Sequence, residues 1–368
     1  MADRIVLLGG TGFTGGLVAR ELVHREVPFL FTGRDPEKVD RAVARLGGAD
    51  HAVVDVTDGE RLREVMRPGD VVIDCAGPFL ALGEPVVEAC VEARAHCLDT
   101  TGEQVYMKRI HDRFDEPARD AGVAVVNAMA FEYAPGDAAA ALAARGLEQP
   151  LRGLDVTYGW RGSSTATSRG TRASVLHVLA HRGYGYRRGA WERERVARET
   201  REVEVAPGRW RPAVTFPSGE VLTVPRQAEV EVVRGWIIVS RPVALAARFL
   251  GPVLPPVVRI LSPLLEPLVR MGPEGPSPEQ RGGSRFEITA RAVGADGRSK
   301  SCAVRGRDPY GITASLLGAA SERLVRRPDP GTAEGAPVGV LAPSRLLEPT
   351  ELLEGLRGRG LAWDVEEG

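Results

Sequence analysis

A glycine-rich turn near the start of the chain has the residue types and the spacing to hold a diphosphate. Three glycines recur at intervals of three residues in "GGTGFTG" (9–15), directly after an apolar run and at the start of a helical pattern. Such a turn lets the backbone approach a pyrophosphate, whose charge the free N–H groups and the positive helix end stabilise. A purely structural turn is the alternative. The residues expected to contact the dinucleotide here are Gly9, Thr11, Gly12, Phe13, Thr14 and Gly15.

The end of the second apolar run indicates which dinucleotide is bound. A domain that prefers NAD usually places Asp or Glu there, where it accepts from the ribose 2′-hydroxyl. Here "PFLFTG" (28–33) is followed by Arg34, which fits a 2′-phosphate, and Asp35 is predicted to cap a helix that begins with Pro36. NADP(H) is therefore the predicted cofactor. The residues expected around its 2′-phosphate are Thr32, Arg34 and Lys38, and Gly33 is expected to line the same part of the cofactor site.

Further loops are expected to complete the cofactor site. Asp55 and Val56 follow the third apolar run and are placed to border the adenine. "CAGPF" (75–79) follows the fourth run, where small residues let the backbone approach the nicotinamide ribose. Pro78 and Phe79 are expected to lie under the nicotinamide ring. The residues predicted in this part of the site are Cys75, Ala76, Gly77, Pro78, Phe79 and, after the fifth run, Gly102.

The elements that must position these loops follow from the hydrophobic pattern. Six short apolar runs alternate with helical stretches between residues 4 and 129, which predicts a doubly wound parallel sheet of the Rossmann type in an α/β fold. After residue 150, longer alternating strands, the last two joined by "ADGR", predict an antiparallel sheet in an α+β domain. The charged stretch 193–204 is interpreted as a solvated helix face. We expect an NADP-binding domain at 1–130, a substrate or lid domain at 131–305, and a C-terminal helix and strand at 306–368 that return to the first domain.

Composition narrows the functional classes. A net charge of −1 over 368 residues argues against a nucleic-acid partner held by phosphate neutralisation. The four cysteines form no CxxC pair, so neither a disulfide framework nor a zinc site is predicted, and no metal is expected. The apolar run of "MADRIVLLGG" is too short for a signal peptide, which favours a cytoplasmic location.

Residues 241–271 form an unusually apolar segment that prolines 252, 255 and 256 interrupt. Its longest charge-free run is too short to span a bilayer. We expect an amphipathic segment that covers a hydrophobic substrate cleft, rests peripherally on a membrane or joins two subunits of a homodimer. Ordinary packing on the second domain is the alternative.

Several motifs in their order along the chain resemble the saccharopine dehydrogenase-like oxidoreductases and, among them, the trans-acting enoyl reductases. These are "GGTGFTG", "TGR", "DCAGPF", "CLDTTGE", "RGTRAS", "GPSPEQR" and "DPYGITASLL". The resemblance implies a Rossmann domain, an α+β domain and NADP(H) as hydride carrier. It also implies a phosphate loop at Gly9, Gly12 and Gly15, a ribose-phosphate contact at Arg34 and a nicotinamide-side loop at 77–79.

The acid or base that would accompany hydride transfer is less clearly marked. Residues after the fifth and sixth apolar runs lie at the expected cofactor edge, among them Asp99, Thr101, Glu103, Glu132 and Tyr133, and Tyr310 opens the helix that returns. The predicted catalytic residues are Tyr133, Asp99 and Tyr310, although Asp99 is also suited to hydrogen-bond the neighbouring loop, and a tyrosine at a strand end is suited to simple packing.

Two further groups have residue types that occur in binding sites. His177 and His181 have a spacing compatible with a metal, but no third ligand is evident and their helix is predicted to face the core. The hydroxyl-rich stretch 163–171 is predicted either to hold an anionic or thioester oxygen at a helix start or to be a polar loop.

Three functions are compatible with these features. The first is an NADPH-dependent reductase of the C=C bond of a hydrophobic acyl or polyketide substrate. The second is a saccharopine-type C=N reductase of amino and keto acids, which would need convergent arginines in the second domain. The third is a noncatalytic NADP-binding protein associated with lipid through residues 241–271.

Overall fold

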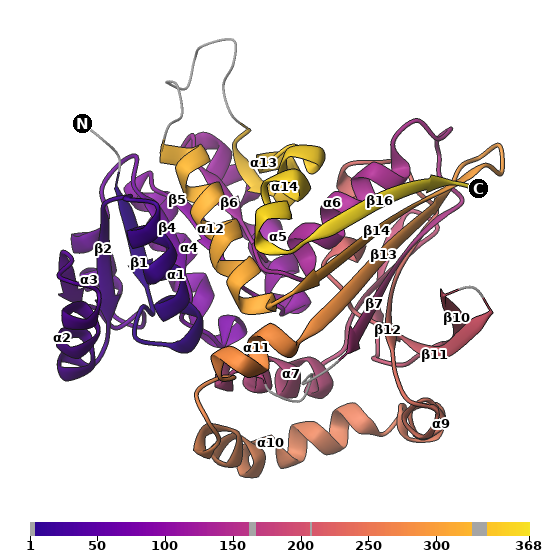
Figure 1. Cartoon of the computed structure of the whole chain (residues 1–368), viewed down its shortest axis with the longest axis horizontal. Coiled ribbons are helices and arrows are strands. Elements are labelled where there is room, and N and C mark those ends of the chain that lie inside the picture. Colours follow the sequence, from indigo (N-terminus) through magenta and orange to yellow (C-terminus); the bar gives the residue numbers. More distant parts are fainter. Residues whose placement is uncertain (1–3, 162–166, 207, 326–336) are drawn as a thin grey trace. The chain divides into compact units, whose positions relative to one another are not determined.

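The computed structural model describes residues 4–161, 167–206, 208–325 and 337–368, which fold into two compact units (Figure 1). The first unit comprises residues 1–101, 106–134 and 310–348. The second comprises residues 102–105, 135–309 and 349–368. The chain therefore crosses between the units several times, and neither unit is a single continuous segment.

The first unit contains a seven-stranded parallel sheet in the order β15-β6-β5-β4-β1-β2-β3. Most of its strands are continuous apolar runs that are completely buried, as parallel strands with helices on both faces must be. The strands are β1 (Ile5–Leu8), β2 (Phe29–Gly33), β3 (His51–Val53), β4 (Val71–Asp74), β5 (His96–Asp99), β6 (Ala124–Val126) and β15 (Gly339–Leu341). The predicted Rossmann fold is confirmed.

Helices follow the strands of this sheet one by one. They are α1 (Phe13–His24), α2 (Pro36–Arg45), α3 (Gly59–Val65), α4 (Phe79–Ala93), α5 (Gln104–Asp120) and α12 (Pro309–Val325), with the short α13 (Pro343–Leu346). Helix α6 (Tyr133–Ala144) begins in the first unit and continues into the second. The hydrophobic core on one side of the sheet includes Leu62, Val86, Tyr106 and Ile110, all nearly inaccessible to solvent.

The second unit contains a nine-stranded mixed sheet. Its main path is β10-β11-β12-β7-β13-β14-β16, and β8 pairs with β12 and β9. Most pairs are antiparallel as predicted, but β7 and β12 pair in parallel. The strands are β7 (Gly153–Arg161), β8 (Gly183–Arg187), β9 (Ala190–Glu194), β10 (Thr200–Ala206), β11 (Arg209–Phe216), β12 (Val232–Ile238), β13 (Arg285–Val293), β14 (Ser299–Arg307) and β16 (Ala362–Glu367).

Two expectations about this sheet were wrong. The charged stretch 193–204 is not a helix, because β9 pairs with β8 and β10 pairs with β11 through this region. The last strand does not return to the first domain, because β16 pairs with β14 over six residues and forms the end of the second sheet. Of the C-terminal region, α12, β15 and the short helix at 343–346 belong to the first unit, and the expected boundaries at 130 and 305 lie instead near 134 and 309. Strand β15 is only three residues long, too short to carry a recognisable strand pattern in the sequence.

The remaining helices of the second unit are α7 (Arg169–Ala180), α8 (Glu220–Thr223), α9 (Arg241–Leu250), α10 (Leu254–Met271), α11 (Pro278–Gly283) and α14 (Pro349–Gly355). Helix α10 packs against α7, where Val258 contacts Leu176 and Ala180 (Figure 1). Within the described residues no single helix has the length and apolarity to cross a bilayer. Helix α9 and residues 255–265 of α10 reach that length only together, with a bend of 107° between them.

Candidate cofactor and reaction site

The glycine turn between β1 and α1 is shaped by backbone contacts that exclude side chains. Gly9 has a φ of +70°, and a Cβ atom there would lie 3.0 Å from the backbone of residues 75 and 76. A Cβ atom on Gly15 would lie only 2.3 Å from the carbonyl oxygen of Gly9, so the start of α1 packs directly on the turn. The backbone N–H of Gly12 closes the turn by donating to the Gly9 carbonyl at 3.0 Å. These are the contacts that a dinucleotide-binding turn requires.

The N-terminus of α1 is suited to an anion. Gly12 is the N-cap, no side chain caps the helix, and its first turn holds no acidic residue. No carboxylate of the first turn therefore competes with a bound diphosphate for the N–H groups there. Tyr310 of α12 lies next to this turn, with its ring edge-to-face against Phe13 at 5.0 Å between centroids. The residues present fit the diphosphate of a dinucleotide.

The residues predicted at the end of β2 have different environments. Asp35 caps α2 by accepting from the backbone N–H of Lys38 at 3.1 Å, which confirms its predicted structural role. Arg34 and Lys38 have exposed side chains, and among the described residues no acidic group lies within ion-pair distance of the Arg34 guanidinium. Thr32 differs from expectation, because it is buried and its hydroxyl donates to the Leu7 carbonyl at 2.9 Å inside the sheet. Gly33 packs tightly under Thr11, where a Cβ atom would be 2.7 Å from the threonine methyl.

The loop after β3 is organised by its own hydrogen bonds. The Asp55 carboxylate accepts from the backbone N–H of Thr57 at 3.0 Å and from its hydroxyl at 2.8 Å. These bonds, rather than the weaker attraction to Arg34, are the main cause that lowers the pKa of Asp55. Val56 is buried in the hydrophobic core of the first unit. The two residues keep their predicted place at the carboxyl end of β3, but the Val56 side chain faces the core.

In the loop after β4, the backbone at Gly77 is accessible to solvent and the Phe79 side chain is buried. Gly77 is exposed, and Cys75, Ala76 and Pro78 are half-buried. Phe79 does not lie at the surface as a floor for the nicotinamide ring, since it is 5% exposed and packs on Tyr106 at 5.8 Å between centroids. The expectation for Phe79 was wrong because it is the first residue of α4, and that position turns the side chain into the core.

Two buried carboxyl groups stand side by side at the ends of β4 and β5. Asp74 and Asp99 occupy paired positions in the sheet, and burial raises the pKa of Asp74 to about 7 and that of Asp99 to about 6. Asp74 accepts from the backbone N–H of Ala76 at 2.8 Å and so shapes the loop after β4. Asp74 is not among the residues predicted from the sequence, although its place directly before "CAGPF" marks it as a residue that orders that loop.

Asp99 holds the neighbouring loops. Its carboxylate accepts from the backbone N–H of Thr101 at 3.0 Å, that of Ala128 at 2.8 Å and the Asn127 side chain at 2.6 Å. Ala128 has a φ of +61°, an unfavourable conformation for alanine that the hydrogen bond to Asp99 supports. The geometry therefore matches the alternative use of Asp99, as a residue that orders the loops after β5 and β6.

Glu132 has the environment of a proton donor. It follows β6 in the first unit, and burial raises its pKa to about 7. Its Oε2 atom is shielded from solvent and accepts no hydrogen bond from the described residues. The next residue, Tyr133, is 3% exposed at the start of α6. Because β4, β5 and β6 are adjacent parallel strands, the loop after β6 lies on the same sheet edge as Gly77.

Other predicted groups occupy the second unit. Gly102 lies in the short segment 102–105 of that unit, and Glu103 accepts from the Ser174 hydroxyl at 2.9 Å and lies 3.9 Å from His177. Within the described part of the chain, no cluster of three or more potential metal ligands includes the two histidines. In the stretch 163–171, residues 163–166 lie outside the described residues, and Ser168 caps α7 by accepting from Thr171.

Helices α9 and α10 carry large apolar side chains that are exposed. Eleven of them, each at least 41% exposed, constitute what we name the apolar face, whereas the opposite side of α10 packs on α7 through Val258. Helix α9 buries no residue. The apolar face consists of Val243, Leu245, Phe249, Leu250, Val253, Val257, Ile260, Leu261, Leu264, Leu268 and Met271. The alternative of ordinary packing on the second domain describes the side of α10 that contacts α7, and the apolar face is left exposed.

Comparison with known proteins identifies the first domain. Residues 5–130 match the family model of the "Saccharopine dehydrogenase NADP binding domain", so the cofactor of this domain is NADP(H). The bovine "Saccharopine dehydrogenase-like oxidoreductase" is 30% identical over 151 residues, which are 36% of this chain and 35% of that protein. A Caenorhabditis elegans "Lipid droplet localized protein" is 33% identical over 145 residues, which are 36% of this chain and 34% of that protein. A Mycobacterium ulcerans "Trans-acting enoyl reductase" is 31% identical over 139 residues, which are 36% of this chain and 33% of that protein.

These matches span about a third of the length of the curated relatives. The fold of the whole chain is similar to that of apo histidine-tagged saccharopine dehydrogenase (L-Glu forming) from Saccharomyces cerevisiae. The TM-score is 0.59 at 14% sequence identity, with 99% of this chain and 100% of that chain covered. The predicted resemblance and the two-part fold are both confirmed.

Proposed function

We propose that this chain, whose residues 5–130 form an NADP-binding domain of the saccharopine dehydrogenase type, is an NADP(H)-dependent oxidoreductase that reduces the C=C bond of a hydrophobic acyl or polyketide substrate. The observation that carries the substrate class is the apolar face, since contiguous exposed apolar side chains of this kind mark a binding surface. Similarity to a relative named as a trans-acting enoyl reductase supports the same reaction.

The residues of the first unit divide the work of this reaction. Bound NADPH supplies the hydride. The backbone of 9–15 and the N-terminus of α1 would hold the diphosphate, and Arg34 would hold the 2′-phosphate.

Reduction of an enoyl thioester also needs a proton at the α carbon and a donor to the carbonyl oxygen. We assign the proton to Glu132, whose raised pKa keeps it protonated up to about pH 7, and the carbonyl contact to Tyr133. Asp99 and Tyr310 are assigned to positioning, because one orders the loops and the other lies beside Phe13.

We further propose that the apolar face rests on a lipid surface, where a hydrophobic substrate would be found. Arg241, Arg248 and Arg259 are exposed on the same two helices, whose sequence contains Glu266 as the one acidic residue. Apolar side chains among arginines are typical of helices that lie in the interface of an anionic membrane. The name of the C. elegans relative, a lipid droplet localized protein, is consistent with this arrangement.

Flotation with vesicles tests the lipid contact. The purified protein should float with phosphatidylcholine vesicles that contain phosphatidylserine, and Ile260→Asp with Leu264→Asp should lower the bound fraction at least tenfold. Val365→Asp, on the exposed Val365 of β16, is the matched control and should float like the wild type. If the wild type does not float, or if the double variant only converts a dimer into a monomer in light scattering, the apolar face is not a lipid contact.

Substrate screening tests the reaction. NADPH oxidation should be observed with long-chain enoyl thioesters and not with keto-acid and amine pairs. Oxidation with only the latter would establish C=N chemistry in its place. Tight NADPH binding without oxidation of any of these substrates would support the noncatalytic alternative.

A further inference from the structure

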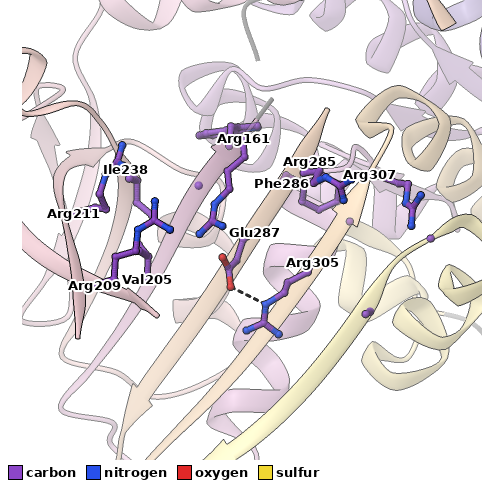
Figure 2. A pocket seen from close by; sticks show the side chains of 15 residues that line it. Arg161, Val205, Arg209, Arg211, Ile238, Arg285, Phe286, Glu287, Arg305 and Arg307 are labelled. Atoms are coloured by element: carbon purple, nitrogen blue, oxygen red, sulfur yellow. Dashed lines mark hydrogen bonds and ion pairs between the residues drawn. The ribbon is translucent and has the colours of Figure 1, made fainter. Parts of the chain in front are cut away.

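The second unit contains a groove of about 390 Å³ whose charged lining consists almost entirely of arginine. Glu287 is the one acidic side chain among the lining residues, against six arginines. Figure 2 shows Arg209 and Arg211 of β11 on one side, Arg285, Arg305 and Arg307 of β13 and β14 on the other, and Arg161 of β7 between them. The groove lies on the face of the sheet that is opposite to the buried side chains of β13, such as Ile288.

Three of these arginines stand in a row across adjacent strands. Arg285 pairs with Arg161 of β7 on one side and with Arg307 of β14 on the other. Side chains at directly paired positions have Cβ atoms about 5 Å apart, and like charges there are destabilising. Three like charges on neighbouring positions of the sheet therefore disfavour one another, and an anion between them would relieve this. Such a row of arginines is what a site for an anion requires.

The groove has almost no negative charge of its own to balance these groups. The Arg305 guanidinium forms an ion pair with Glu287 at 2.8 Å (Figure 2). Arg305 also contacts Asp364 at 2.5 Å. In the described part of the chain no carboxylate lies within ion-pair distance of the other five arginines. The chain as a whole has a net charge of −1, so the excess of positive charge in this groove is a local feature and does not follow from the composition.

We propose that this groove binds a small molecule that carries two or more phosphate groups. Arginine forms paired hydrogen bonds with phosphate oxygens, and the volume is that of a small-molecule site. An amino-acid substrate fits less well, because its ammonium group would need a carboxylate partner and Glu287 is already paired. Phosphate groups bring no such cation. Acyl carriers of the coenzyme A type and simple diphosphates share this chemistry.

Titration calorimetry on the full chain, saturated with NADP⁺ so that the site of the first unit is filled, tests the proposal. The probes are coenzyme A, pyrophosphate and L-glutamate. Coenzyme A or pyrophosphate should bind, with an affinity that falls as salt rises. Arg161→Gln with Arg307→Gln should weaken that binding at least tenfold. The control Arg291→Gln changes an exposed arginine of the same strand face of β13, outside the groove, and should leave the affinity within twofold.

Thermal unfolding separates a binding role from a structural one. Without ligand, Arg285→Gln should raise the Tm, since it removes like-charge repulsion; a lowered Tm would mean that the arginine row supports the fold, and would overturn the argument. Tighter binding of coenzyme A than of pyrophosphate would identify an acyl-carrier ligand, and equal binding a simple diphosphate, and either result supports the proposal. No binding of the phosphorylated probes, tighter binding of glutamate, or unchanged binding in the double variant would overturn it. These readouts require no turnover, so they stand apart from the reductase assay.

Discussion

At the scale of single residues, the chemistry of the first unit depends on a few side chains in loops after the strands. Arg34 is exposed at the end of β2, where the neighbouring acidic residue, Asp35, is used to cap α2. Glu132 is kept largely protonated near neutral pH by burial. Residues that serve only the fold lie next to them: Asp35 follows Arg34 and caps α2, and the buried Ala134 lies two positions after Glu132. Position along the chain alone therefore does not separate residues of the site from residues of the fold.

Replacement of Arg34 by alanine should selectively weaken NADPH binding. A charge-assisted contact with phosphate contributes about 1.5 to 3 kcal/mol, so the Kd for NADPH should rise roughly tenfold to a hundredfold while the Kd for NADH changes little. Fluorescence titration of both cofactors measures the difference, and Arg41→Ala on exposed α2 is the control. Equal loss for both cofactors would remove Arg34 from the 2′-phosphate site.

Replacement of Glu132 by glutamine should slow the reductive reaction. General acids contribute about 10²- to 10⁴-fold, so kcat should fall by at least a hundredfold while NADPH binding is retained. The wild-type kcat should also decline as the pH rises through about 7, because Glu132 then loses its proton, and this decline should vanish in the variant. Glu88→Gln, on the exposed side of α4, should behave as the wild type. If the pH profile of kcat in Glu132→Gln is the same as that of the wild type, Glu132 is not the acid.

At the scale of elements, the turn between β1 and α1 depends on how closely a helix can approach a strand. Gly15 and Gly16 are neighbours in sequence, but only the first faces the turn. A Cβ atom on Gly15 would lie 2.3 Å from the Gly9 carbonyl oxygen, whereas on Gly16 the nearest atom would be 3.6 Å away. Since α1 must present its N–H groups at a fixed place, a displacement of the helix alters the anion site.

Gly15→Ala should therefore lower the free energy of unfolding by roughly 1 to 3 kcal/mol and strongly reduce NADPH affinity. Gly16→Ala is the matched control and should leave both nearly unchanged or slightly raise stability, because alanine favours a helix. Urea unfolding and cofactor titration measure the two effects. Similar results for both variants would mean that the turn adapts more easily than the contact distance indicates.

At the scale of the whole molecule, each unit contains buried carboxyl groups that make stability depend on pH. Burial raises the pKa of Asp74 and Glu220 to about 7 and that of Asp99 to about 6. Glu220 lies in the second unit, where the Tyr158 hydroxyl donates to it. In the unfolded chain these groups release their protons near pH 4 to 4.5, whereas in the folded protein they retain them to higher pH. The folded state is therefore favoured below pH 4.5 by these groups, and that contribution is lost as the pH rises through 6 to 7.

Glu220→Gln should flatten this dependence. Glutamine stays neutral at every pH and can still accept from Tyr158, so the decrease in unfolding free energy between pH 5 and pH 8 should be smaller by roughly 1 to 3 kcal/mol. Asp74 and Asp99 remain and should preserve part of the slope. Urea unfolding at several pH values measures it, with Glu88→Gln as the control. A slope identical to that of the wild type would show that Glu220 does not titrate in this range.

The sequence by itself determined the features that depend on local pattern. Alternating apolar runs and helices predict the parallel sheet, the spacing of Gly9, Gly12 and Gly15 predicts the turn, and "TGRDP" predicts both the cap at Asp35 and the preference for NADP(H). Each of these is decided by a few neighbouring residues whose backbone conformation and hydrogen bonds are local.

Only the tertiary structure decided which side of an element faces the core and which distant strands pair. Thr32 and Phe79 turn inward, β16 joins β14, and the three arginines of the groove meet because β7, β13 and β14 lie side by side. The apolar face is likewise visible only once α10 is packed on α7. The physical reason is that strand pairing and burial join residues far apart in the chain, so they depend on contacts that no local pattern contains.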